Sequence, residues 1–70
     1  MEEFKIQEGY EYIQLNQLLK MLGLVDSGGE ANQHILNEEV MVNGEVEIQK
    51  RKKLRPGDKI DFAGNQITIK

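Results

Sequence analysis

The sequence predicts an α+β fold in which a short helix pair packs on a small, mostly antiparallel β-sheet. Apolar residues follow a helical period before residue 38 and alternate with polar residues after it. The pair Asn43-Gly44 in the second part is typical of a tight hairpin. A chain of 70 residues is also short enough to predict one domain, residues 1–70, with a single modest core.

One strand and one helix are expected in the first part of the chain. Phe4 and Ile6 alternate with polar neighbours, which predicts a strand near the N-terminus. The first helix, residues 15–22, is indicated by four leucines that share one face at the spacing i, i+3, i+4 and i+7: Leu15, Leu18, Leu19 and Leu22. Gly23 follows at once and is expected to end this helix.

A second helix is expected over residues 28–37, with Ser27 as its N-cap. Glu30 lies three residues after Ser27, so the hydroxyl can accept from the Glu30 N–H while the carboxylate accepts from the Ser27 N–H. This spacing makes Glu30 a capping residue rather than a catalyst. Asn37 is the expected left-handed residue at the helix end.

Alternation of apolar and polar residues predicts four further strands: residues 40–42, 46–48, 60–62 and 67–69. Asn43-Gly44 joins the first two as a hairpin, and residues 49–53 form a charged connection. The sequence Arg55-Pro56-Gly57-Asp58 is typical of a β-turn, with proline second and glycine third.

The charge is unevenly distributed along the chain. Residues 1–49 contain two basic and ten acidic side chains, a balance of −8, whereas residues 50–70 contain seven basic and two acidic side chains, a balance of +5. Five of the nine bases fall within six positions: Lys50, Arg51, Lys52, Lys53 and Arg55. Such a concentrated positive region attracts a polyanion at one place, while the acidic remainder repels it elsewhere.

Several classes of function are excluded by the composition. The absence of cysteine excludes a disulfide scaffold and a thiolate zinc site, and a single histidine excludes the usual multi-histidine metal sites. No catalytic Ser/His/Asp set or nucleotide-binding loop is present, so we expect no enzyme, no metal and no cofactor. No apolar run approaches about 20 residues and the N-terminus is acidic, which predicts a cytoplasmic protein without a membrane partner.

Residues 13–62 resemble the alpha-L RNA-binding domain, first named from the small-subunit ribosomal protein S four. More narrowly, they are similar to its stand-alone YaaA-like and YbcJ-like subgroup. The motifs that carry the resemblance are Leu18-Leu19-Lys20, Ser27-Gly28-Gly29-Glu30-Ala31, Val40-Met41-Val42-Asn43-Gly44-Glu45 and Lys53-Leu54-Arg55-Pro56-Gly57-Asp58. The resemblance implies a helix pair on a small antiparallel sheet, with structured RNA held along the helices and the adjoining hairpin.

The chain also departs from the pattern of these relatives. Family members usually carry basic residues at three positions that are Gln14, Gly28 and Asn32 here. The glycine usual before the Val-x-Val strand is Glu39, which places a negative charge near the expected RNA face. Any binding is therefore expected to depend mainly on the basic residues 50–55, where phosphate contacts release counterions.

The expected RNA-binding residues are Lys20, Ser27, Gly28, Gly29, Asn32, His34, Asn43, Lys50, Arg51, Lys52, Lys53 and Arg55. Gly28-Gly29 either admits a phosphate at the helix start or only gives a flexible entry to the helix. Asn43 is first a turn residue, and His34 lies off the apolar stripe and is expected to be exposed. Tyr10 and Tyr12 favour a strand edge or lid over a base-stacking platform.

The predicted function is a small stand-alone RNA-binding protein that holds structured RNA, ribosomal RNA or tRNA, by phosphate and shape contacts. We expect a monomer whose further partners are the ribosome or its assembly factors. The alternative is a protein-interaction adaptor that uses its acidic half against a basic ribosomal or assembly partner. Salt-dependent retention of RNA distinguishes the two, because it requires phosphate contacts.

Overall fold

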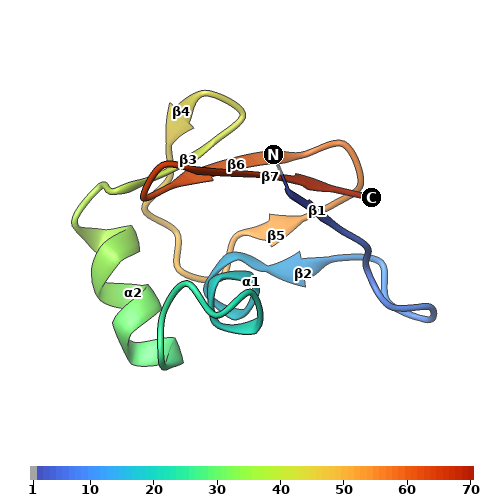
Figure 1. Ribbon diagram of the computed structural model, residues 1–70, viewed down its shortest axis with the longest axis horizontal. Coiled ribbons are helices and arrows are strands. Elements are labelled where there is room, and N and C mark those ends of the chain that lie inside the picture. Colours follow the sequence, from blue (N-terminus) through green and yellow to red (C-terminus); the bar gives the residue numbers. More distant parts are fainter. Residues whose placement is uncertain (1) are drawn as a thin grey trace.

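The computed structural model describes residues 2–70 and contains two helices and seven strands (Figure 1). The elements are β1 (Glu2–Phe4), β2 (Ile13–Gln14), α1 (Leu15–Met21), α2 (Gly28–Leu36), β3 (Val40–Val42), β4 (Glu45–Val46), β5 (Lys53–Leu54), β6 (Lys59–Phe62) and β7 (Asn65–Ile69). Five strands form one sheet in the order β1-β7-β6-β3-β4, and β2 pairs with β5. Both helices lie on one side of the five-stranded sheet, which confirms the predicted fold class (Figure 1).

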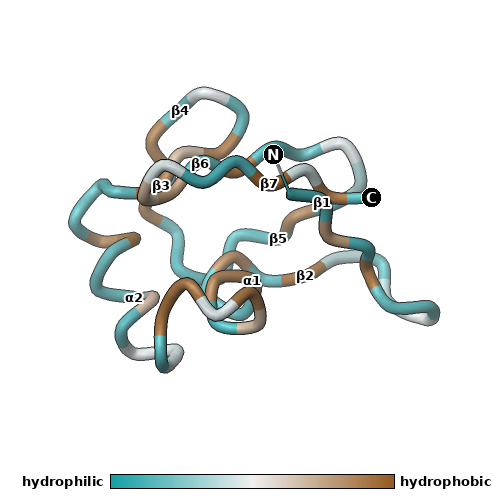
Figure 2. Tube along the Cα trace, viewed as in Figure 1, coloured by the Kyte–Doolittle hydropathy of each residue, from teal (hydrophilic) through white to brown (hydrophobic). Residues whose placement is uncertain are grey.

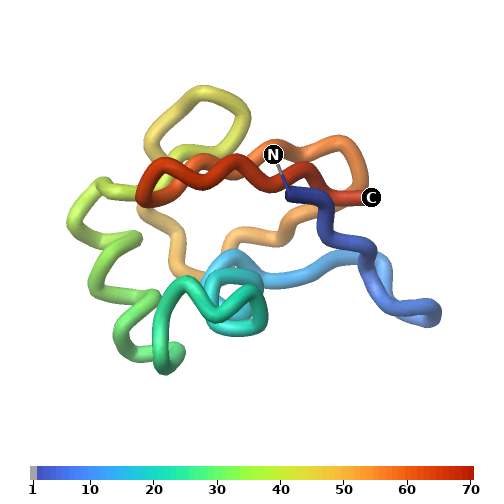
Figure 3. The backbone as a smooth tube through the Cα atoms, in the orientation of Figure 1, coloured from blue at the N-terminus to red at the C-terminus, as the bar shows by residue number. Residues whose placement is uncertain are grey.

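Two-residue turns set the register of the sheet. Asn43 and Gly44 both have positive φ, 54° and 85°, and place Met41 opposite Val46 in the antiparallel pair β3–β4. Ala63 and Gly64 do the same between β6 and β7, with φ of 52° and 81°. Only β1 runs parallel to its neighbour β7, which brings the first strand beside the last (Figure 3).

The helix ends agree with the sequence in part. The Ser27 Oγ accepts from the Glu30 N–H at 3.1 Å, which confirms the cap. The Glu30 carboxylate, however, accepts from the N–H of Asp26 at 2.9 Å and not from that of Ser27. The left-handed residue that ends α2 is Glu38, with φ of 62°, whereas Asn37 keeps a negative φ.

The Glu38 conformation belongs to a Schellman motif. The Glu38 N–H donates to the Ile35 carbonyl and the Glu39 N–H to the His34 carbonyl, both at 3.1 Å. The prediction for Asn37 was wrong by one residue because this pair of bonds places the left-handed residue one position after the C-cap. Gly23 occupies the same place at the end of α1, with φ of 73°.

Two strand predictions need correction, and two further strands were not predicted. β4 ends at Val46, so Ile48 lies outside it and is 55% exposed, and β1 ends at Phe4 rather than continuing to Ile6. The strands β2 and β5 were not predicted, since strands of two residues are too short to show alternation. The Glu47 N–H still donates to the Val40 carbonyl at 2.9 Å, and after this residue the chain leaves the sheet and runs to the start of α1.

One apolar core lies between the helices and the sheet. It consists of Ile13, Leu15, Leu18, Leu19, Val25, Ala31, Ile35, Val40, Val42, Leu54, Ile60, Phe62, Ile67 and Ile69. The helices contribute the predicted leucine stripe and the Ala31/Ile35 pair, and the sheet contributes every second residue of β3, β6 and β7. Neither helix in residues 2–70 combines the length and apolar character that crossing a membrane requires.

Candidate nucleic-acid interface

The five clustered bases, Lys50 to Lys53 and Arg55, are called the basic cluster below. Its backbone is fixed at the start of α1, because the Lys52 carbonyl accepts from the Leu15 N–H at 2.9 Å and the Lys50 carbonyl accepts from the Asn16 N–H at 3.0 Å. The pairing of β5 with β2 and the buried side chain of Leu54 continue this attachment. The segment therefore descends from the sheet to the first turn of α1 (Figure 3).

The local sequence explains why the chain takes this path. The first N–H groups of a helix lack partners within it, and Gln14, the N-cap of α1, supplies no side-chain hydrogen bond. The carbonyls of Lys50 and Lys52 satisfy two of these groups instead. Figure 2 shows this connection as a hydrophilic stretch that leads to α1, in which hydrophobic and hydrophilic residues are mixed.

The charged ends of the basic cluster remain free within the fold. Four of its side chains are exposed and that of Lys52 is half-buried. In residues 2–70, the Lys70 Nζ pairs with the Glu3 Oε2 at 2.8 Å and the His34 Nδ1 lies 3.1 Å from the Glu39 Oε2, so neither contact involves the cluster. The arrangement fixes the backbone and leaves all five positive charges available to an external anion.

An aromatic ring that sequence reasoning did not connect with the cluster lies beneath two of its members. The Lys53 Nζ is 5.0 Å from the centre of the Tyr12 ring and the Arg55 Cζ is 6.0 Å from it. Cations at this distance from an aromatic face are attracted to it. Tyr12 precedes β2, and the β2–β5 pairing that brings it here has no signature in the sequence.

Two amides extend the interface across the helix pair. The Asn16 Nδ2 on α1 donates to the Asn32 Oδ1 on α2 at 3.0 Å, so Asn32 lies next to the helix turn that holds the basic cluster. The buried Asn16 Oδ1 has no hydrogen-bond partner in the described part of the chain. Lys20 is exposed one turn after Asn16, and residues four apart share a helix face.

The start of α2 follows the C-terminal end of α1, whereas the basic cluster lies at its N-terminal end. Ser27 uses its hydroxyl in the cap. A Cβ atom at Gly28 would meet nothing within 4 Å, and one at Gly29 would meet only the Ser27 Oγ at 3.8 Å. The two glycines are therefore open to solvent and are not needed for packing.

Asn43 and His34 are engaged elsewhere in the fold. The Asn43 Nδ2 donates to the Asp58 Oδ1 at 3.0 Å, and the Asn43 Oδ1 accepts from the Lys59 N–H at 2.9 Å. His34 was expected to be exposed, but it is half-buried, with its ring 5.1 Å from that of Phe62 and its Nδ1 3.1 Å from the Glu39 Oε2. That prediction was wrong because the C-terminal end of α2 packs on β6.

The interface consists of charged, amide and aromatic side chains. Within residues 2–70, no group of three His, Asp or Glu side chains is placed to bind a metal ion. Positive charge, amide groups and an aromatic ring are the groups that this interface offers to a partner.

Comparisons with known proteins agree with the geometry. The S4 domain family matches residues 4–70. The chain is 35% identical over 60 residues to the "Putative RNA-binding protein YbcJ" of Escherichia coli (strain K12), covering 86% of each sequence. It is 37% identical over 54 residues to the "Probable ribosome maturation protein RlbA" of Bacillus subtilis (strain 168), covering 77% of this chain and 76% of the relative.

A solved structure gives the same result for the fold. The solution structure of E. coli YbcJ, described as revealing an alpha-L motif involved in RNA binding, matches with a TM-score of 0.72 and 33% identity. The match covers 99% of this chain and 86% of YbcJ. The resemblance drawn from the motifs is thereby confirmed, and the chain belongs to the S4 domain family.

Proposed function

We propose that this protein binds structured RNA and that the basic cluster is its main phosphate anchor. Asn32 and Lys20 lie beside the cluster on the helix pair and extend the surface. Double-stranded RNA presents a narrow major groove that side chains do not read, so contact with phosphates and overall shape is the expected mode. Asn43 is left out of the contact surface because its amide is hydrogen-bonded within the fold, and His34 because its half-buried ring packs against Phe62.

One observation carries this proposal: a positive segment with a fixed backbone and unpaired side chains. Fixing the backbone lowers the conformational entropy that binding would otherwise cost. Leaving the bases without carboxylate partners means that no ion pair must be broken before phosphate is bound. The names of YbcJ and RlbA add support, because they associate relatives with RNA and with ribosome maturation.

The finer features of the proposal are supported by the name of RlbA, which associates a relative with ribosome maturation. The RNA is ribosomal RNA or tRNA, and the site of action is the ribosome or one of its precursors in the cytoplasm. The protein acts as a single-domain monomer, by binding and without catalysis. Its affinity is modest, because Gln14, Gly28 and Asn32 replace three bases of the family pattern.

Crosslinking in cells followed by sequencing of the attached RNA tests the proposal. Wild type is compared with a triple variant, Lys50→Ala, Arg51→Ala and Lys53→Ala, expressed to the same level. We expect ribosomal RNA or tRNA fragments from one region to be enriched with wild type and lost with the variant. Equal recovery of RNA by both proteins would contradict the assignment of the anchor.

A second candidate function, the protein adaptor, is favoured by the outer face of the sheet. Met41 and Val46 are exposed there as a cross-strand pair, and Glu39 and Asp61 line a shallow depression beside Met41. This mixture of apolar and acidic side chains suits a basic, partly apolar protein segment. Loss of a basic partner on Met41→Asp, with no salt-dependent retention of RNA by wild type, would favour this candidate.

A further inference from the structure

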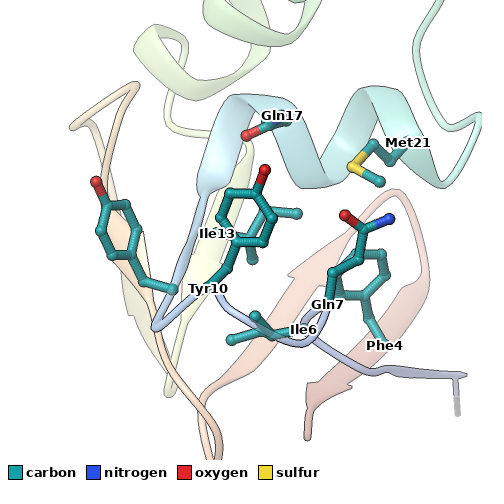
Figure 4. Close-up of a pocket in the computed structure, with 8 residues that line it drawn as sticks. Phe4, Ile6, Gln7, Tyr10, Ile13, Gln17 and Met21 are labelled. Atoms are coloured by element: carbon teal, nitrogen blue, oxygen red, sulfur yellow. The ribbon is translucent and has the colours of Figure 1, made fainter.

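A pocket of about 130 Å³ lies between α1 and the N-terminal segment (Figure 4). Gln17 and Met21 lie on the α1 side of it, the Tyr10 ring points toward Gln17, and Gln7 and Phe4 lie across from Met21 (Figure 4). We call it the tyrosine pocket; it is lined by Phe4, Ile6, Gln7, Tyr10, Tyr12, Ile13, Gln17 and Met21. All eight lining side chains are uncharged.

We propose that the tyrosine pocket receives one unpaired pyrimidine base of the bound RNA. The inference rests on the proposed function and deepens it by naming a feature of the RNA. The size of the pocket is the first argument. Apolar protein cavities of about 150 Å³ accept a benzene molecule, so the available space corresponds to one six-membered ring.

The position of Tyr10 is the second argument. The residue is 68% exposed although it lines the pocket, so part of its surface is open to a partner. A turn holds it in place, because the Tyr10 N–H donates to the Gln7 carbonyl at 3.1 Å and Gly9 adopts a positive φ of 94°. An exposed aromatic face on a fixed backbone can stack on a base of any sequence.

The polar groups of the pocket fit a base edge. Gln7 and Gln17 each carry an amide with both a donor and an acceptor. The edge of a pyrimidine likewise presents donors and acceptors side by side. The floor formed by Phe4, Ile6 and Ile13 is apolar and contacts the ring rather than its edge.

Continuity with the basic cluster argues for a nucleic-acid occupant over an apolar protein side chain. Tyr12 lines the tyrosine pocket and also lies under the Lys53 Nζ at 5.0 Å, so the two sites share a wall. Glu8 and Glu11 flank Tyr10 in sequence and repel phosphate. The RNA backbone then stays on the side of Lys53 and Arg55, and only a neutral base turns into the pocket.

The test compares two RNA hairpins that are identical except for one bulged uridine. Wild type is expected to bind the bulged hairpin more tightly than the fully paired one. Tyr10→Ala should lose that preference, with affinity for the bulged hairpin falling roughly tenfold, because the variant has no aromatic side chain on which the base can stack. Tyr10→Phe keeps the ring and should keep the preference.

The controls distinguish a loss of base binding in the tyrosine pocket from a loss of RNA binding as a whole and from unfolding. Leu36→Ala removes an apolar side chain of similar exposure on α2 and should leave both affinities unchanged. Equal binding of the two hairpins by wild type, or an unchanged preference in Tyr10→Ala, overturns the base pocket while RNA binding itself stands. Binding of neither hairpin overturns the proposed function. Tyr10→Ala is not expected to unfold the protein, which circular dichroism checks.

Discussion

The basic cluster and the outer face of the sheet use hydrogen bonds in opposite ways. In the basic cluster the backbone is bound, through the carbonyls of Lys50 and Lys52, and the side chains are free. On the acidic side the carboxylates themselves are engaged: that of Glu39 faces His34, and that of Glu47 accepts from the Gln49 N–H at 3.0 Å. In these two regions, the carboxylates of Glu39 and Glu47 face groups of the fold, whereas the five positive charges of the basic cluster have no carboxylate partner.

The largest effect on stability is expected from disrupting β5, the strand that holds the basic cluster in place. Leu54 is fully buried in β5, so Leu54→Ala should lower the free energy of unfolding by about 2–5 kcal/mol. The matched change in the acidic region, Val46→Ala in the exposed β4, should cost less than about 1 kcal/mol. Urea denaturation of both variants measures the difference, and equal losses would show that β5 does not hold the cluster.

Asn43 connects the hairpin of the acidic region to the turn that carries Arg55. Asn43→Ala removes its hydrogen bonds to Asp58 and Lys59 and should lower the free energy of unfolding by about 2 kcal/mol. RNA affinity, measured well below the melting temperature, should stay unchanged, since the amide serves the fold. If the variant had normal stability and reduced RNA affinity, Asn43 would instead be shown to contact the RNA.

A smaller decrease in stability is expected at the start of α2, away from both regions. Ser27→Ala removes the acceptor for the Glu30 N–H and should destabilise the protein by about 1 kcal/mol. Thermal unfolding measures this decrease. An unchanged melting temperature would mean that the hydroxyl contributes nothing to the helix start.

A pair of charge changes of similar size, one in each region, sharpens the contrast further. Asn32→Lys adds a positive charge next to the basic cluster and should tighten RNA binding, raising the dependence of log affinity on log salt by about 0.9 units. Glu39→Gln removes a negative charge beside His34 and should change affinity less, because that carboxylate lies on the sheet side of α2. Titration of one folded RNA at two salt concentrations shows which variant changes the affinity more. A larger effect of Glu39→Gln would place the RNA on the sheet side of α2 instead of beside the basic cluster.

Local rules were sufficient for much of the fold. The leucine stripe, the Ser27 cap and the Asn43-Gly44 turn depend on residues at most seven positions apart, and each is present as predicted. The strands β2 and β5 were missed because each is a strand only through its pairing with the other, about 40 residues away in sequence. No pattern within either segment reveals that pairing. Ile48 was wrongly placed in a strand for a related reason: the residues that follow it are hydrogen-bonded to the start of α1, and no local pattern reveals that contact.

The candidate interface shows the same division. The charge of the basic cluster is evident in the sequence, but its attachment to α1 and the position of Tyr12 beneath Lys53 arise from tertiary contacts. Asn43 and His34 illustrate the opposite error, since polar side chains that look available in sequence are engaged by Asp58 and Glu39. Composition therefore indicates the kind of partner, and only the contacts decide which side chains are free to meet it.

The central claim, that the basic cluster anchors RNA because of where its charges lie, is tested by two matched triple variants. One carries Lys50→Ala, Arg51→Ala and Lys53→Ala. The other carries Lys5→Ala, Lys59→Ala and Lys70→Ala, three exposed lysines outside the cluster. Both remove three positive charges, so any difference in RNA binding reports position and not net charge.

The measurement is the slope of log affinity against log salt for one folded RNA. We predict that the slope of the first variant is smaller than that of wild type by about 0.9 units for each phosphate that the protein no longer neutralises, whereas the second variant keeps nearly the slope of wild type. Equal reductions in both variants would show that only net charge matters. An unchanged slope in the first variant would show that the phosphate anchor lies elsewhere.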